Sequence, residues 1–193
     1  MPLPRDFVFG TSTASYQVEG GVRAGGRGRS IWDDFCDRPG TIRDGSSGAV
    51  ACDSFHRWDE DVALLSGLGA DAYRFSIAWP RIQPTGSGPV NAEGLDFYDR
   101  AVDALCEAGI APFATLYHWD LPSPLQATGG WMARETADRF GEYAAVVGER
   151  LGDRVAMWMP VNEPVVVTIF GHAIGIHAPG EERGFEALGA AHH

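Results

Sequence analysis

The sequence predicts an α/β fold, a (β/α)8 TIM barrel, of which the chain supplies about the first four βα units. Segments with strand-like composition alternate with amphipathic helical segments, which is typical of a parallel sheet. No Gly-x-Gly-x-x-Gly or Gly-x-x-x-x-Gly-Lys motif follows a predicted strand, which argues against a nucleotide-binding α/β fold. Polar side chains gather instead at the carboxyl ends of the predicted strands, where a TIM barrel carries its active site.

The predicted barrel begins with a short strand and long loops. Residues 7–9 are apolar, and we expect them to be the first strand. Residues 20–50 are rich in glycine, which is typical of irregular loops, with a short helical turn at residues 31–35.

The first long helix and the second strand follow these loops. A helix over residues 55–68 is predicted because apolar side chains recur every three or four residues, and Gly69 ends it. Its apolar face consists of Trp58, Val62, Leu65 and Leu68. Residues 71–79 are rich in aromatic and β-branched side chains and end at Pro80, which predicts a strand with one bulky apolar face.

The same cycle of helix and strand occurs twice more. Asn91 can cap a helix over residues 91–108, and a strand follows at about residues 110–119. The next helix is predicted at residues 134–151 and the next strand at about residues 155–162.

Four predicted strands are half of what a TIM barrel requires. A sheet of four strands has two unpaired edges and a lumen face without its opposing layer. We therefore expect residues 1–193, with a last helix that begins near Phe185, to be the amino-terminal half of one barrel domain without an internal boundary. We also expect this half-barrel to self-associate through its exposed edges.

Composition excludes several classes of partner. All 15 basic residues are Arg, and 26 acidic residues give a formal charge of −11, which argues against nucleic acid and anionic membranes. No apolar run approaches the roughly 20 residues that span a bilayer, and the first residues do not resemble a signal peptide. Three widely spaced cysteines indicate a reducing compartment, so we predict a cytoplasmic protein.

The segment Met-Pro-Val-Asn-Glu-Pro carries the candidate catalytic residue Glu163. The backbone before Pro164 is stiff, and Asn162 can both donate and accept hydrogen bonds beside the carboxylate. A partly desolvated Glu can have a raised pKa and act as a general acid. From the spacing alone, a Glu that caps the following helix or pairs with an Arg is the more common role.

Two further segments have the composition of a sugar-binding site. His118, Trp119 and Asp120 offer in succession an imidazole, an indole and a carboxylate, which suit the hydroxyl groups and the C–H face of a sugar. Gln17 offers an amide after the first strand. A core Trp with a satisfied His, and a surface Gln, are the alternatives for these segments alone. His172 and His177 lack a third ligand, so no zinc site is expected.

Together, these segments resemble the glycoside hydrolase family 1 β-glucosidases. The motifs occur in the family's order and extend over nearly the whole chain. They lie at residues 9–20, 73–82, 115–122, 162–164 and 175–180.

The resemblance implies a retaining β-glycosidase that releases terminal β-D-glucosyl residues from oligosaccharides or from aryl and alkyl glucosides by double displacement. By the same resemblance, Glu163 is the acid/base and Arg74 lies against the nucleophile. The implied sugar-binding residues are Gln17, His118, Trp119 and Asn162. The resemblance implies no metal and no organic cofactor.

One departure from the family pattern bears on activity. The family's nucleophile lies in a Thr/Ser-Glu-Asn-Gly motif after the seventh strand, and this motif does not occur in residues 1–193. We therefore expect the chain to be inactive alone. Two alternatives stay open: a 6-phospho-β-glycosidase of the same family, and a non-catalytic half-barrel that binds sugar or assembles with other chains.

Overall fold

A computed structural model describes residues 2–192 and contains a four-stranded parallel sheet. The strands follow one another in sequence order, so each pairs in parallel with the next. They are β1 (Gly10–Ser12), β2 (Ala72–Ser76), β3 (Ala111–Tyr117) and β4 (Met157–Val161). The predicted alternation of strands and helices in an α/β fold is confirmed.

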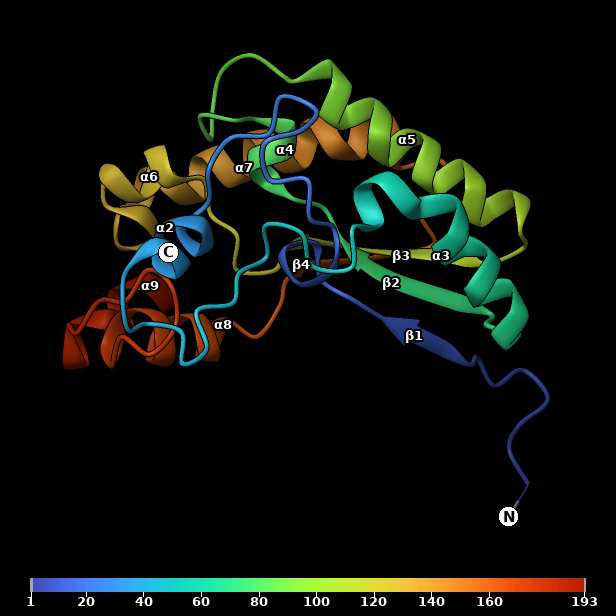
Figure 1. Cartoon of the computed structure of the whole chain (residues 1–193), viewed down its shortest axis with the longest axis horizontal. Helices are drawn as coiled ribbons and strands as arrows, with labels where there is room; N and C mark the ends of the chain where they lie inside the picture. Colours follow the sequence, from blue (N-terminus) through green and yellow to red (C-terminus); the bar gives the residue numbers. More distant parts are fainter. Residues whose placement is uncertain (1, 193) are drawn as a thin grey trace.

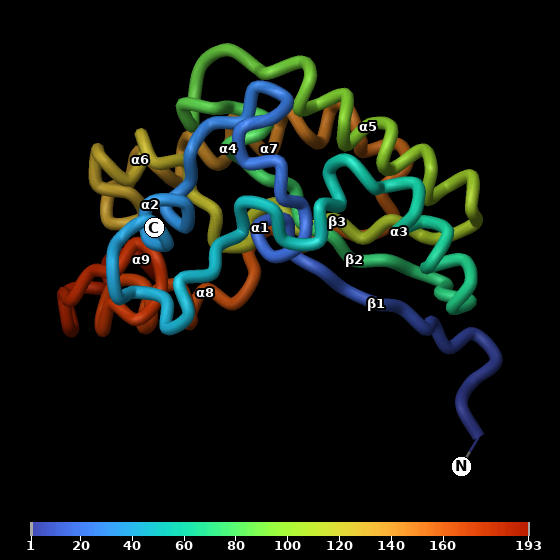
Figure 2. The backbone as a smooth tube through the Cα atoms, in the orientation of Figure 1, coloured from blue at the N-terminus to red at the C-terminus, as the bar shows by residue number. Residues whose placement is uncertain are grey.

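Helices occupy the connections between the strands and the end of the chain. Figure 1 shows α5 and α7 along one side of the sheet, while the first residues extend away from it (Figure 2). The helices are α1 (Ser15–Val18), α2 (Ile31–Asp37), α3 (Ser54–Leu68), α4 (Trp79–Ile82), α5 (Ala92–Glu107), α6 (Ser123–Ala127), α7 (Arg134–Leu151), α8 (Pro164–Val166) and α9 (Leu188–His192). Tighter or wider turns form η1 (Gly130–Met132), η2 (Val167–Ala173) and η3 (Gly184–Ala187).

The first strand lies three residues later than the sequence predicts. Residues 7–9 precede β1, and Phe7 and Phe9 are largely exposed. Pairing with β2 starts at Gly10, where a Cβ atom would lie 2.8 Å from the carbonyl oxygen of Ala72. Only a residue without a side chain permits this approach, and apolar composition does not carry that information.

The second strand is shorter than predicted, because its last residues turn into the helix α4. Ala78 donates its backbone N–H to the hydroxyl of Tyr98 over 2.8 Å, which takes this donor out of the sheet. Pro80 lies in the first turn of α4, where a missing N–H is tolerated. Trp79 is fully buried at this point, so the expected apolar face is kept without the strand.

The three long helices match their predicted ranges closely, with two differences of detail. Leu68, expected on the apolar face of α3, is 74% exposed. Asn91 precedes α5 but does not cap it, because its amide donates to the carbonyls of Gly25 and Arg81. A tertiary contact thus replaces the local one.

The end of the described chain is less regular than expected. Phe185, the predicted start of the last helix, lies in the turn η3 and is 93% exposed, and α9 follows it. The prediction for His193 lies outside the described residues. Within residues 2–192 we find no helix that combines the length and apolar character needed to cross a bilayer.

The core lies between the sheet and its covering helices. Tyr73 and Phe75 of β2 pack against Trp58 of α3, and Phe75 also stacks on Tyr98 of α5. The opposite face of the sheet bears polar groups, and at its margin Met157 is 50% exposed. The covered face therefore stabilises the fold.

Replacing a buried leucine of α5 tests this core. Leu105 is fully buried, so we expect Leu105→Ala to lower the free energy of unfolding by about 2–5 kcal/mol. Leu68→Ala is the matched control, since Leu68 is exposed, and it should change the free energy by less than about 0.5 kcal/mol. Urea unfolding followed by circular dichroism measures both. Equal losses of unfolding free energy in the two variants would contradict the assignment of Leu105 to the core and Leu68 to the surface.

Candidate active site

The polar residues predicted to be functional come together at one edge of the sheet. Arg74 lies on β2, His118 follows β3, and Asn162 and Glu163 follow β4. Because neighbouring parallel strands end at the same edge, residues distant in sequence become neighbours there.

Asn162 is the centre of this arrangement. Arg74 Nη2 donates to Asn162 Oδ1 over 2.7 Å, and since a guanidinium only donates, this contact fixes the orientation of the amide. Asn162 Nδ2 then lies 3.3 Å from His118 Nε2 and 3.3 Å from Glu163 Oε2. Trp119 Nε1 donates to the backbone oxygen of Asn162 over 2.9 Å. One amide therefore holds together side chains from three strand ends.

Glu163 is exposed and has an unusual backbone. Its φ of 47° and ψ of 64° lie in the left-handed region, which residues with a side chain seldom adopt. It precedes α8, yet its side chain makes no capping hydrogen bond to that helix, so the capping interpretation is not supported. The carboxylate contacts Asn162, and the residue is otherwise exposed.

Gln17 joins the site through a shared cavity rather than through a hydrogen bond. It lies on α1, is exposed, and lines a cavity of about 420 Å³ together with His118 and Trp119. All six residues predicted from the sequence thus lie at this edge. Four of them contact Asn162 directly, and Gln17 lines the cavity beside them.

Two aromatic walls of this cavity were not predicted. The imidazole of His177 lies 5.5 Å from the ring of Trp119 and 5.7 Å from the ring of Trp32, between centroids. Both His177 and Trp32 line the cavity. Trp32 lies in the predicted helical turn, where nothing in the local pattern distinguishes a cavity wall from a core residue.

His118 is held in its neutral form. Burial lowers its pKa to about 4, and the nearby Arg74 guanidinium adds to this effect. With Asn162 Nδ2 as a donor, Nε2 must accept, so the proton lies on Nδ1. The neutral imidazole adds no charge to the cavity, and its Nδ1 has no hydrogen-bond partner among residues 2–192.

Asp120, the carboxylate that the sequence groups with His118 and Trp119 for sugar binding, is fully buried in the structure. Ser15 Oγ donates to Asp120 Oδ2 over 2.7 Å, and Ser76 Oγ lies 3.1 Å from Ser15 Oγ. Asp120 Oδ1 is buried without a hydrogen-bond partner among residues 2–192. Burial raises the pKa of Asp120 to about 7, while the Ser15 hydrogen bond opposes this shift. The Ser15 contact ties the start of α1, which bears Gln17, to the segment after β3.

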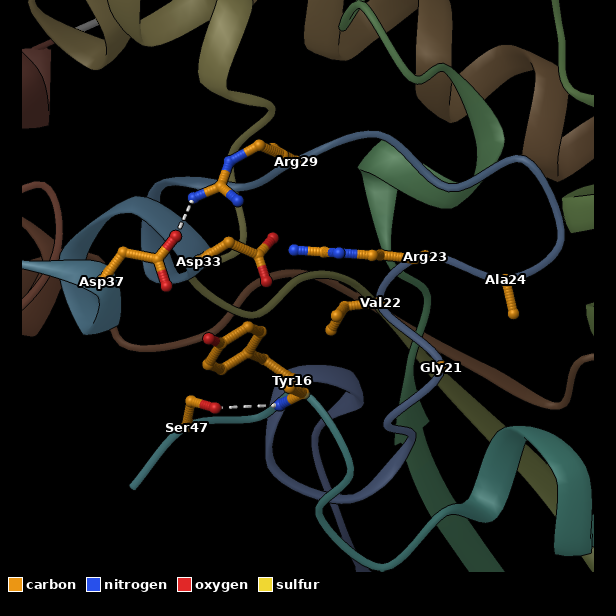
Figure 3. Close-up of a pocket in the computed structure, with 10 residues that line it drawn as sticks. Tyr16, Gly21, Val22, Arg23, Ala24, Arg29, Asp33, Asp37 and Ser47 are labelled. Carbon is orange, nitrogen blue, oxygen red and sulfur yellow. Dashed lines mark hydrogen bonds and ion pairs between the residues drawn. The ribbon is translucent and has the colours of Figure 1, made fainter. Parts of the chain in front are cut away.

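A second cavity lies beyond Tyr16 and has a different character. It measures about 520 Å³ and shares Tyr16 and Ser47 with the first cavity. Figure 3 shows Arg23, Arg29, Asp33 and Asp37 directed into it, and Arg29 Nη2 pairs with Asp37 Oδ2 at 2.6 Å. The first cavity is aromatic and suits a sugar ring, whereas this one is ionic. The part of the chain that the structure describes holds no cluster of three or more metal-ligating side chains.

The chain is similar to known glycosidases over nearly its whole length. The family model described as glycosyl hydrolase family 1 matches residues 1–193. Beta-glucosidase A of Thermotoga maritima is 53% identical over 190 residues, and a beta-glucosidase of an Agrobacterium species is 52% identical over 191 residues. These alignments include 98% and 99% of this chain but only 43% and 42% of the relatives. The chain thus spans less than half the length of these relatives.

Solved structures give the same result. A family 1 β-glucosidase from Thermotoga maritima superposes with a TM-score of 0.97, over 98% of this chain and 43% of that one. The virulence factor SghA, solved with its substrate analogue salicin, superposes with a TM-score of 0.97 at 51% identity, over 98% of this chain and 42% of that one. The similarity confirms that the four strands correspond to part of a family 1 TIM barrel.

Asp120 and His118 predict opposite dependences of stability on pH. The pKa of Asp120 is about 7 in the folded chain, above its ordinary 3.8, so between these values the folded state binds a proton that the unfolded state does not. The stability that this proton gives is lost as pH rises towards 7. The folded pKa of His118, about 4, lies below its ordinary 6.5, so its contribution increases as pH rises through that window. Between pH 4 and 6.5 the two slopes oppose each other.

Single variants should reveal each slope. In the Asp120→Asn variant, the free energy of unfolding should rise with pH in this window. In the His118→Gln variant, the free energy of unfolding should fall with pH. Each slope should be at most about 1.4 kcal/mol per pH unit. Urea unfolding at a series of pH values measures the slopes, with the exposed Asp59→Asn as the control. A parallel pH dependence of both variants and the parent chain would refute the assignment.

Proposed function

This chain belongs to glycosyl hydrolase family 1, and on that premise we propose that it carries the acid/base part of a retaining β-glucosidase site. The reaction is the release of terminal β-D-glucosyl residues from oligosaccharides or from aryl and alkyl glucosides, by double displacement. The observation that carries the proposal is the group of contacts around Asn162, which brings Glu163 within reach of the same bound sugar as His118 and Arg74.

Glu163 is the proposed proton donor. In a retaining mechanism, one carboxyl group protonates the glycosidic oxygen as the bond breaks, and then acts as a base towards water in the second step. The carboxylate of Glu163 is exposed, so a leaving group can reach it. A general acid needs partial desolvation to keep its proton, and we propose that the bound substrate and the other half of the barrel provide it.

Sugar binding is proposed for the cavity that Gln17, His118 and Trp119 line. The amide of Gln17 and the imidazole of His118 supply directional hydrogen bonds, and the aromatic walls supply surface for the C–H face of a pyranose ring. Asn162 lies next to Glu163, so its amide is placed to contact a hydroxyl beside the anomeric carbon.

Arg74 has two roles in this proposal. Its Nε donates to Thr115 Oγ1 over 2.8 Å and its Nη2 to Asn162 Oδ1, which positions the amide. The guanidinium also provides a positive charge on the lumen side of the sheet. We propose that this charge keeps a nucleophilic carboxylate ionised when a second half of the barrel supplies one.

We further propose that residues 1–193 form one domain unit that acts in the cytoplasm. The support for this location is that Cys36, Cys52 and Cys106 are all free thiols.

A chimeric enzyme tests the proposed activity. Residues 1–193 would replace the matching 43% of beta-glucosidase A of Thermotoga maritima. We expect the chimera to hydrolyse nitrophenyl β-glucoside and cellobiose. In this chimera, Glu163→Gln should lower kcat/KM by about 100-fold to 10,000-fold for cellobiose, because a poor leaving group needs a proton, and by less for the activated nitrophenyl substrate. The exposed Glu182→Gln is the control. Similar losses for both substrates would refute the acid/base role.

The 193-residue chain alone should not turn over aryl β-glucosides at rates typical of enzymes. The reason is that double displacement needs two carboxylates, and removing one member of a cooperative catalytic set costs several orders of magnitude. Release of nitrophenol, with Glu163→Ala as the control, is the measurement. Turnover that this substitution abolishes would contradict the expectation.

A non-catalytic sugar-binding module is the second candidate function. It is favoured by the aromatic cavity, whose walls all lie within the described chain. Calorimetry with glucose or an iminosugar would detect this binding, and Trp119→Ala should weaken it. No heat at millimolar ligand would count against this candidate and leave the chimera experiment unaffected.

A further inference from the structure

Three buried polar side chains form one chain of hydrogen bonds near the carboxyl ends of the strands. Ser15 N donates to Ser76 Oγ over 2.7 Å, and Ser76 Oγ donates to Ser15 Oγ over 3.1 Å. Ser15 Oγ in turn donates to Asp120 Oδ2 over 2.7 Å. The three residues are 3%, 2% and 0% exposed, so solvent does not compete for these hydrogen bonds.

Each member of this chain of hydrogen bonds follows or ends a different strand. Ser15 begins α1 after β1, Ser76 is the last residue of β2, and Asp120 follows β3. Gln17 comes two residues after Ser15, and Trp119 directly precedes Asp120. The contacts therefore connect the backbone that bears the amide of the sugar cavity to the backbone that bears its indole.

The place of Gln17 depends on this connection. Its side chain makes no hydrogen bond among residues 2–192, so only the backbone of α1 positions it. α1 has four residues and is too short to be stable by itself. Glu19 anchors its carboxyl end, because it accepts from Arg81 Nε and Nη2 over 3.2 and 3.1 Å. Ser15 anchors its amino end, so the contact with Asp120 sets how α1 lies relative to the segment after β3.

The segment around Trp119 depends on the same contact. The φ of Trp119 is 78°, a conformation that persists only where surrounding contacts determine it. On the far side of Asp120, the carbonyl of Leu121 accepts from Ile31 N over 2.9 Å, next to the cavity wall Trp32. Asp120 is thus the fixed point between two aromatic walls of the cavity.

Asp120 is a costly residue for a purely structural position. Its Oδ1 is buried without a hydrogen-bond partner among residues 2–192, and a buried oxygen of this kind destabilises the folded state. An apolar side chain of similar volume would fill the space without that penalty. The carboxyl group supplies direction instead, because its other oxygen accepts the Ser15 hydroxyl in one geometry.

We propose that Asp120 is a positioning residue of the sugar cavity, which sets the place of Gln17 relative to Trp119 and thereby the affinity for the sugar ring. This inference rests on the function proposed above. Asp120 acts through its neighbours and does not itself contact the sugar, since it is fully buried. The proton donor Glu163 and Arg74 have their own contacts with Asn162, so the chemistry of bond cleavage is held separately.

Kinetics of the chimera with beta-glucosidase A test the consequence for binding. Asp120→Leu removes the acceptor at similar side-chain volume. We expect it to raise KM for cellobiose and the inhibition constant of glucose by about tenfold or more, and to change kcat by less than about threefold. The reason is that the affected contacts are made to the sugar both before and in the transition state.

A conservative variant and a control accompany this measurement. Asp120→Asn keeps an oxygen that accepts from Ser15, so both constants should stay within about threefold of the parent. Burial raises the pKa of Asp120 to about 7, so the uncharged carboxyl group that Asn resembles is already present near neutral pH. Ser54→Ala is the control, since Ser54 is equally buried at the start of α3 and has no part in the site.

A double variant separates positioning from stability. Ser15→Ala removes the other partner of the same hydrogen bond, and it replaces Asp120→Leu if that variant does not fold. The double variant Ser15→Ala/Asp120→Leu should unfold at a higher urea concentration than Ser15→Ala, because it leaves no unpartnered carboxylate. Its KM should nevertheless stay as high as that of the single variants, since all of them lack one contact. A KM that recovers together with the stability would overturn the positioning role.

Amide hydrogen exchange of the 193-residue chain tests the positioning without any activity. In Ser15→Ala and Asp120→Leu, the amides of residues 15–18 should exchange about tenfold faster or more than in the parent chain, whereas Asp120→Asn should preserve their protection. Unchanged exchange, or a loss of kcat without a rise in KM, would overturn this inference. An inactive parent chimera would overturn the proposed function instead, and the exchange rates, together with calorimetry of the same variants with an iminosugar, would then decide the positioning role.

Discussion

The arrangement of the site depends on the hydrogen bond between Arg74 and the side chain of Asn162. Because the guanidinium can only donate, it fixes which end of the amide is oxygen, and this determines what the amide nitrogen can do. That nitrogen reaches both His118 and Glu163, so the proton position on the imidazole and the place of the carboxylate follow from one contact. The bond spans two strands, β2 and β4, and it forms only when the parallel sheet is correctly registered.

Backbone strain accompanies this contact. Trp119 and Glu163, which both contact Asn162, have positive φ angles, which are costly for residues with side chains. Such conformations persist where surrounding contacts determine them. The indole N–H of Trp119 is held by the backbone oxygen of Asn162, and the next residue, Asp120, is anchored in the interior by Ser15. The contact between Asp120 and Ser15 thus helps to fix the backbone of the neighbouring Trp119.

Much of the fold was predictable from the sequence because periodicity reports which faces are buried. The helices α3, α5 and α7 were located almost to the residue, since glycines end two of them and their apolar positions repeat. The first strand was misplaced, because its position depends on how closely Gly10 approaches Ala72, and the second was too long, because Tyr98 withdraws a donor from its end. In the site, motifs located the six predicted residues. The burial of Asp120 and the placing of Trp32 and His177 as cavity walls could not be predicted, because they arise from contacts between distant segments.

The sequence by itself determined the α/β class, the order of the elements and the residue types available for glycosidase chemistry, because these depend on local patterns and on motifs within single segments. Only the tertiary structure decided which of those residues meet. Arg74 donates to Thr115 of β3, 41 residues later in the sequence, and to Asn162, 88 residues later. His118 follows the same strand β3, so the paired strands bring all three side chains together.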